Sequence, residues 1–179
     1  MGKKNKIKTS KKSEPSVVPS VNPKKQTPVG SSFLLYLAGA VCITAICFWP
    51  MLDNGFTNWD DEFYVIQNQL LRGPDWEGIF SKPVVSNYHP LTVATLAFNY
   101  QSSELDPSSY LMTNFVLHLI NTALVFLLVW KLSDGKTWVA FFASLIFGIH
   151  PMHVESVAWV SERKDVLYTL FFYWVHSIW

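Results

Sequence analysis

Two uninterrupted apolar runs, each twenty residues long, dominate the pattern of the sequence. Residues 33–52 and residues 111–130 contain no Asp, Glu, Lys or Arg. A helix of about twenty residues is about 30 Å long, which matches the hydrocarbon core of a bilayer. We therefore expect both runs to cross a membrane as helices.

Two shorter apolar runs follow, at residues 137–150 and 166–179. The first is about 20 Å long as a helix, which is short of a full crossing unless the bilayer is thin. The second stops in mid-run at Trp179, where a chain end inside hydrocarbon would leave its last carbonyls and its carboxylate without partners. The pattern predicts four helical spans and a truncated chain.

Polar side chains interrupt the 111–130 run on one side only. They recur at spacings of three and four residues, which places them on one helical face: Asn114, His118, Asn121 and Thr122. A polar face inside a bilayer points toward other helices or toward a hydrated cavity. We expect this face to lie inside the protein.

The segment between the first two spans, residues 53–109, forms the predicted external loop. Its residues 90–100 carry apolar side chains on one helical face, and Pro90 suits a first helical turn with His89 at the cap. Residues 75–80 follow a Gly-Pro pair and predict a second short helix. The predicted fold class is an all-α polytopic membrane protein with short interfacial helices in its first external loop.

Charge is segregated along the chain, although the formal net charge is only +1. Residues 1–30 hold eight lysines and one acid, a net charge of +7, whereas residues 31–179 have a net charge of −6. Residues 1–31 also combine Lys, Ser and Pro without apolar periodicity, which predicts a disordered basic tail. No basic cluster lies on the apolar part, so nucleic acid is not an expected partner.

The distribution of lysines sets the predicted orientation. The basic tail is expected in the cytoplasm, and Lys131 and Lys136 return there after the second span. Arg163 and Lys164 then fall on the opposite side, against the positive-inside bias. Either this pair has a purpose there, or Glu162 and Asp165 compensate its charge.

Three consecutive acids follow the first span closely: Asp60, Asp61 and Glu62. Crowded carboxylates repel one another, which makes at least one of them more basic, and a general base for a hydroxyl needs this property. The same acids can hold a divalent cation. A solvated acidic turn is the alternative interpretation.

A second polar cluster combines His150, His153 and Glu155, followed by Arg163 and Lys164. The first three residues can point into one cavity if a helix starts at Pro151, but their spacing matches no standard zinc signature, so no metal site is predicted. A polar helix cap with satisfied histidines is the alternative. Arg163 and Lys164 can bind a phosphate, the former through two N–H groups and the latter as a point charge.

Three blocks of sequence carry a family resemblance. The blocks GFTNWDDEFYV, YHPLTVATLAFNYQSSELDPSSYLMTNFVLHLINTAL and IHPMHVESVAWVSERKDVLY stand in this order between about residues 53 and 170. In residues and spacing they resemble the transmembrane and tetratricopeptide-repeat-containing O-mannosyltransferases and their bacterial relatives, of the GT-C superfamily. The resemblance implies a GT-C-like N-terminal transmembrane bundle.

That family transfers a sugar, mannose or a similar one, from a polyprenyl-phosphate carrier to a protein hydroxyl at the non-cytoplasmic membrane face. The acidic motif of its first external loop matches Asp60 and Asp61, so one of these is expected to deprotonate the acceptor. The resemblance, together with the residue patterns above, assigns seven substrate-binding positions: Glu62, His89, His150, His153, Glu155, Arg163 and Lys164.

The family also sets expectations for the whole protein. Residues 32–179 correspond to a partial transmembrane domain, because the family continues with further spans and tetratricopeptide repeats. We expect these residues alone to be poorly active. The expected partners are membrane lipid, a polyprenyl-phosphate-linked sugar and a protein acceptor, and no cofactor is firmly implied. The expected location is a bacterial inner membrane, or the endoplasmic reticulum membrane in a eukaryote.

Two other classes of function fit the apolar pattern. A transporter or channel would line a pathway with the polar face of residues 111–130. A non-catalytic membrane scaffold would need none of the polar clusters. The acids, His153 and Arg163 flank the predicted spans on one side rather than lying at their middle, which favours surface chemistry on a lipid-borne substrate.

Overall fold

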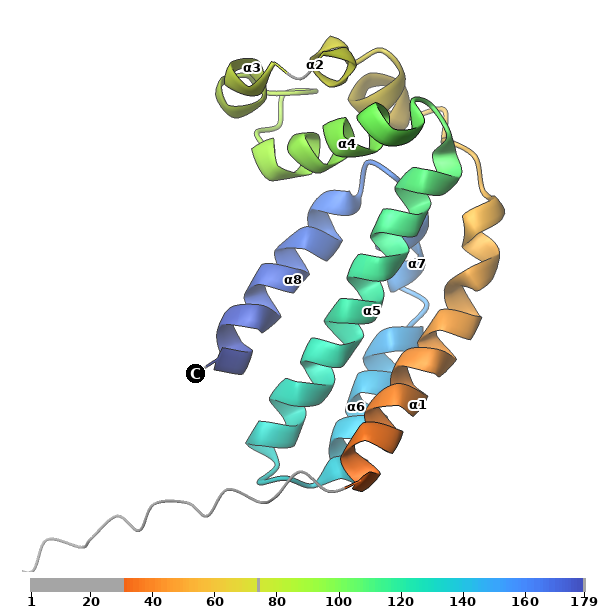
Figure 1. Ribbon diagram of the computed structural model, residues 1–179, viewed down its shortest axis with the longest axis vertical. Helices are drawn as coiled ribbons and strands as arrows, with labels where there is room; N and C mark the ends of the chain where they lie inside the picture. Colours follow the sequence, from red (N-terminus) through yellow and green to blue (C-terminus); the bar gives the residue numbers. More distant parts are fainter. Residues whose placement is uncertain (1–30, 74, 179) are drawn as a thin grey trace, which may run out of the picture.

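The computed structural model describes residues 31–73 and 75–178, and these residues form helices without a β-strand (Figure 1). The predicted basic tail lies outside the described residues except for its last position. In chain order the elements are α1 (Ser31–Phe48), the 3-10 turn η1 (Trp49–Asp53), the π-helical turn η2 (Glu62–Ile66), α2 (Gln69–Arg72), α3 (Trp76–Ser81), α4 (Pro90–Ser103), α5 (Pro107–Leu132), α6 (Thr137–Ile149), α7 (His153–Ala158) and α8 (Arg163–Ile178).

The long helices α1, α5, α6 and α8 form a bundle in which α5 is central (Figure 1). Helix α5 packs against each of the other three, and α1 also packs along α6. The segments Ser32–Asp53 and Pro107–Leu132 are long and apolar enough to cross a membrane, and Thr137–Ile149 is a shorter apolar helix. These features confirm the predicted all-α membrane fold class.

Two short helices of the external loop, α3 and α4, were predicted from the sequence, whereas η2 and α2 were not. Helix α3 begins after Asp75, whose carboxylate accepts a hydrogen bond from Gly78 N at 2.9 Å, and α4 begins at Pro90 directly after His89. Figure 1 shows α4 lying across one end of the bundle, with α2 and α3 beyond it. Its apolar face is buried, as the sequence pattern indicates.

The polar stripe of α5 is also buried. Asn114, His118, Asn121 and Thr122 are each at most 1% exposed, which confirms that this face lies inside the protein. Three of these side chains bond to the backbone of neighbouring helices. Because hydrocarbon offers no hydrogen bonds, polar groups at this depth must find partners within the protein.

Those backbone carbonyls lie near the ends of α6 and α7 and near the start of α8. His118 Nε2 bonds to the Gly148 carbonyl oxygen at 2.8 Å, close to the end of α6. Asn114 Nδ2 donates to the carbonyl oxygens of Val157 at 3.2 Å and Trp159 at 3.1 Å, around the end of α7. Helix α5 thus satisfies carbonyls that the ends of α6 and α7 leave without a full set of helical partners.

We expect Gly148→Ala to destabilise the bundle, because a Cβ atom at Gly148 would overlap Thr44 Oγ1 of α1 and crowd Thr122 of α5. Overpacking of this kind costs about 1–3 kcal/mol. Thermal unfolding in detergent measures the effect. Gly55→Ala is the matched control, since a Cβ there would meet nothing within 4 Å. Equal melting temperatures for the two variants would contradict this account of the α1–α6 contact.

Candidate functional site

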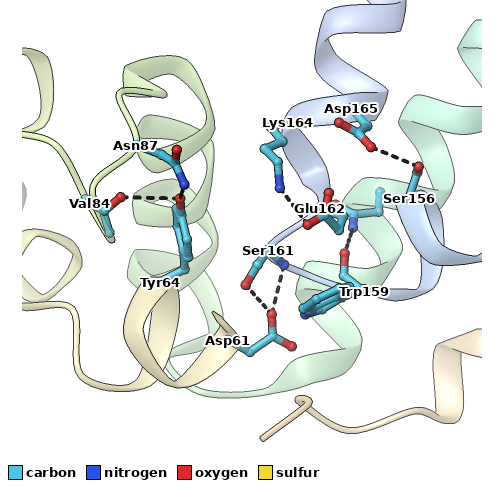
Figure 2. A network of polar contacts seen from close by, with 11 residues as sticks. Asp61, Tyr64, Val84, Asn87, Ser156, Trp159, Ser161, Glu162, Lys164 and Asp165 are labelled. Atoms are coloured by element: carbon cyan, nitrogen blue, oxygen red, sulfur yellow. Dashed lines mark hydrogen bonds and ion pairs between the residues drawn. The ribbon is translucent and has the colours of Figure 1, made fainter. Parts of the chain in front are cut away.

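Asp61 joins the external loop to the turn between α7 and α8. Its side chain is fully buried. Oδ1 accepts hydrogen bonds from the backbone N of Ser161, at 2.9 Å, and from the Ser161 hydroxyl, and Figure 2 shows both contacts. Oδ2 accepts from Thr57 N at 2.9 Å and from Thr57 Oγ1 at 3.1 Å. Both carboxylate oxygens are therefore engaged, and they tie together segments one hundred residues apart.

The neighbouring acids have different surroundings. Asp60 is partly exposed, and no hydrogen bond or ion pair joins its carboxylate to another residue in the described part of the chain. Glu62 begins η2, and its Oε1 accepts a hydrogen bond from Gln67 Nε2 at 2.7 Å. The three consecutive acids thus comprise a buried structural carboxylate between two that reach the surface.

Arg163 is the largest fully buried side chain in the described part of the molecule. Nε donates to Asn114 Oδ1 at 2.7 Å, Nη1 to Asn99 Oδ1 at 2.6 Å and to Thr95 Oγ1 at 3.3 Å, and Nη2 to the Tyr110 carbonyl oxygen at 2.9 Å. These four acceptors are neutral, and none is a carboxylate. The guanidinium therefore joins α4, α5 and α8 through oriented dipoles.

Burial lowers the pKa of Arg163 to about 9, and the Tyr110 phenol opposes this effect. The side chain thus remains a cation at neutral pH. Its charge centre also lies 5.8 Å from the centre of the Tyr110 ring, within the range of a cation–π contact. The guanidinium donates its hydrogen bonds to protein oxygens, and the side chain has no exposed surface. The role of Arg163 as a phosphate ligand stays a prediction.

Lys164 differs from Arg163, although the two are adjacent. Its Nζ lies 2.6 Å from Glu162 Oε1, and its side chain is 27% exposed. Figure 2 shows this pair beside the Asp61–Ser161 contact. At the next residue of α8, Asp165 Oδ2 accepts a hydrogen bond from Ser156 Oγ at 3.1 Å. Of the two predicted phosphate ligands, only Lys164 presents its charge at the surface.

The histidines of the second cluster lie near one another. The rings of His150 and His153 have centres 6.1 Å apart, and the ring of His153 is 5.5 Å from that of His118. His150 is exposed, and its Nδ1 accepts a hydrogen bond from Met152 N at 3.3 Å, as expected for a polar cap. Burial, with a smaller effect of His150, lowers the pKa of His153, so its imidazole is neutral at neutral pH.

Two further predicted residues lie apart from these contacts. His89 precedes α4 and is partly exposed, and its side chain makes no capping hydrogen bond. Glu155 is exposed on α7. In the described part of the chain, no group of three or more His, Cys, Asp or Glu side chains is arranged to hold a metal ion.

Several residues of this region were not identified from the sequence. Thr57 and Ser161 hold Asp61, and Asn99 and Thr95 hold Arg163. Asn99 lies on α4. The sequence pattern identifies it only as a polar residue of that helix and does not indicate its partner. Asn114 was identified as part of a polar face, but a face gives no indication of the residue that it contacts 49 positions later.

Over most of its length the chain is similar to proteins named protein O-mannosyl-transferase. It is 35% identical to human TMTC3 over 144 residues, which cover 74% of this chain and 15% of that protein. Human TMTC1 is 31% identical over 157 residues, covering 81% of this chain and 17% of that protein. Caenorhabditis elegans F38B6.6 is 29% identical over 144 residues, covering 73% of this chain and 21% of that protein.

The chain thus spans only about 15 to 21% of the length of these three relatives. No protein-family model matches it, and no solved structure matches it.

We expect Arg163→Ala to lower the free energy of unfolding by at least about 3 kcal/mol, because it leaves several buried acceptors without a donor. Thermal unfolding in detergent measures the loss. Lys164→Ala is the matched control, and removal of its partly exposed ion pair costs about 0–1 kcal/mol. Arg163→Lys should fall between them, since one ammonium cannot reach four acceptors in the geometry of a guanidinium. Equal losses for the two alanine variants would show that the buried network adds nothing.

Proposed function

This chain is a TMTC-like protein, and from that relationship we propose that it contributes to a membrane glycosyltransferase. The proposed reaction moves mannose or a similar sugar from a polyprenyl-phosphate carrier to a hydroxyl of a protein acceptor. It takes place at the non-cytoplasmic face, where the external loop meets the outer ends of the helices. The observation that carries the proposal is the contact of Asp61 with Ser161, which keeps the acidic motif against the α7–α8 turn.

Asp60 is the proposed general base. A base needs a carboxylate oxygen that can accept a proton from the substrate. The oxygens of Asp61 already accept four hydrogen bonds, and Glu62 accepts one from Gln67. Asp60 is partly exposed and bonds to no other described side chain, so its carboxylate is open to an acceptor hydroxyl.

Asp61 is the proposed positioning residue. It binds Thr57 on its own loop and Ser161 on the turn before α8, so its carboxylate fixes where the backbone of Asp60 stands relative to α8. Asp61 would therefore act through Asp60 and have no contact with the substrate.

The proposed reaction is a single in-line displacement. The acceptor oxygen attacks C1 of the sugar while Asp60 takes the hydroxyl proton, the bond from C1 to the phosphate oxygen breaks, and polyprenyl phosphate leaves with the bonding electrons. The configuration at C1 is inverted as a consequence. Lys164 is the proposed contact for the departing phosphate, because its ammonium is partly exposed next to the Asp61–Ser161 contact.

The alternative of a transport pathway has less support. A pathway needs polar groups that are free to face a passing solute. The stripe on α5 instead bonds to backbone carbonyls and to Arg163. Its arrangement resembles internal packing more than the lining of a channel.

We expect Asp60→Asn to lower the transfer rate by a factor of about 10²–10⁴ without changing the melting temperature, because it removes a base and no internal contact. Transfer of labelled mannose from polyprenyl-phosphate mannose to a serine-containing peptide, in native membranes that carry the protein, measures the rate. Asp61→Asn is the comparison, and it should lower the melting temperature, since its amide NH₂ must face hydrogen-bond donors. Undiminished transfer by Asp60→Asn would remove this residue from the mechanism.

We also expect opposite membrane sides for the external loop and the α5–α6 link. In a variant whose native Cys42 and Cys47 are replaced by serine, single cysteines at Glu77 and Lys136 probe the two regions. An impermeant maleimide added to the non-cytoplasmic side should label the first and spare the second. Labelling of the second alone would invert the assigned topology and remove the proposed site from that face.

A further inference from the structure

A cavity of about 210 Å³ lies between α5, α6, α7 and α8, and the Asp61–Ser161 contact is not part of its wall. Among the described residues that line it, none is a lysine or an arginine, and Asp165 is the one acid. The polar side chains of the wall come from α5, α7 and α8. They are His118, Asn121, His153, Ser156, Asp165 and Thr169.

Asn121 supplies a buried oxygen without a partner. The residue is 1% exposed, and its Nδ2 donates to the Val166 carbonyl oxygen at 2.9 Å. Its Oδ1 has no hydrogen-bond partner among the described residues. The reverse placement of the amide would set two oxygens against each other, so the free atom is the oxygen. A buried unpaired acceptor costs about 1–3 kcal/mol, and a water or an ion that meets it is the ordinary explanation.

Asp165 brings a negative charge to the same cavity. Its Oδ2 accepts a hydrogen bond from Ser156 Oγ at 3.1 Å, and no cationic side chain in the described part of the chain forms an ion pair with it. The neighbouring Lys164 is paired with Glu162 instead, as Figure 2 shows. Asp165 is exposed, whereas Asn121 is buried. The cavity therefore has a carboxylate on its solvent side and a free amide oxygen inside.

These groups are suitable ligands for a small, hard cation. Amide, hydroxyl and carboxylate oxygens favour such ions, and one carboxylate balances one positive charge. An anion does not fit, because no cationic side chain lines the wall. A zinc-type site is not expected either, since the described residues hold no suitable group of three or more His, Cys, Asp or Glu side chains. The volume leaves room for water, so the ion can keep part of its hydration shell.

We propose that this cavity binds a monovalent metal cation such as Na⁺. Asn121 on α5, Ser156 on α7 and Asp165 on α8 provide oxygens to the ion or to its waters. The ion joins the central helix to the two helices that follow the interruption after α6, in the way that interrupted membrane helices form cation sites elsewhere. This role is structural and needs no transfer chemistry, so the proposal stands independently of the proposed reaction at Asp60.

The test measures binding of radiolabelled Na⁺ to the chain in lipid nanodiscs at neutral pH, with choline chloride keeping the ionic strength constant. We expect saturable binding that unlabelled NaCl displaces and that empty nanodiscs lack. The melting temperature should also rise as NaCl replaces choline chloride, because the ion binds the folded state. Displacement by KCl as effective as that by NaCl would support a monovalent site that does not select between the two ions.

Asp165→Asn should weaken Na⁺ binding by at least about tenfold, since it removes the charge that the ion balances. Ser156→Ala is a second variant of the same wall, in case Asp165→Asn alters the fold, and it should also weaken binding. Glu77→Gln is the matched control, because it removes an exposed carboxylate on α3 that does not line the cavity.

Several results would overturn the proposal. A folded chain without saturable Na⁺ binding would leave the cavity as a water site. Displacement of Na⁺ by MgCl₂ or CaCl₂ at much lower concentrations than by NaCl would identify a divalent site instead. Folded Asp165→Asn and Ser156→Ala proteins that bind Na⁺ as tightly as the control would place the ion elsewhere. A melting temperature independent of the exchange of NaCl for choline chloride would remove the structural role.

Discussion

Backbone carbonyls that lack a helical partner are the constraint on which the rest of this structure depends. Between Gly148 and Arg163 the chain ends α6, forms the short helix α7 and starts α8, inside a bundle with two helices apolar enough to span a membrane. Gly148 and Val157 are buried, so side chains must satisfy the carbonyls there that lack a helical partner. Asn114 and His118 meet that need from α5. The central helix is thus an apolar span on its outside and a row of hydrogen-bond donors on its inside.

Arg163 extends the same solution to a buried charge. A single carboxylate partner would cancel that charge but would fix the arginine to only one element. Four neutral acceptors on α4 and α5 instead spread the stabilisation over both helices. The amide of Asn114 belongs to both systems, since its nitrogen caps α7 and its oxygen binds Arg163. The position of helix α4 is therefore coupled to the interruption between α6 and α8.

Sequence patterns predicted the helices and their buried faces well, because these depend on local periodicity and on start signals such as Pro90. The buried stripe of α5 was identified in the same way. The Ser161 partner of Asp61 and the partners of Arg163 could not be predicted, since each of these contacts joins residues 49 to 100 positions apart. A charged residue in an apolar chain suggests a binding site, whereas only the fold shows that Asp61 has both oxygens engaged and that Arg163 has no exposed surface.

The proposed topology puts Arg163 and Lys164 on the side where the positive-inside bias disfavours cations, and their surroundings bear on this placement. That bias concerns charges near the headgroups of the membrane. Arg163 is enclosed by protein dipoles, and Lys164 is paired with Glu162 at 2.6 Å, so neither is a free surface charge. Compensation at Lys164 comes from Glu162, while Asp165 accepts a hydrogen bond from Ser156. A cation on the side that the positive-inside bias disfavours therefore indicates a buried contact between helices as readily as a contact with substrate. Only the hydrogen-bond partners of the cation distinguish the two.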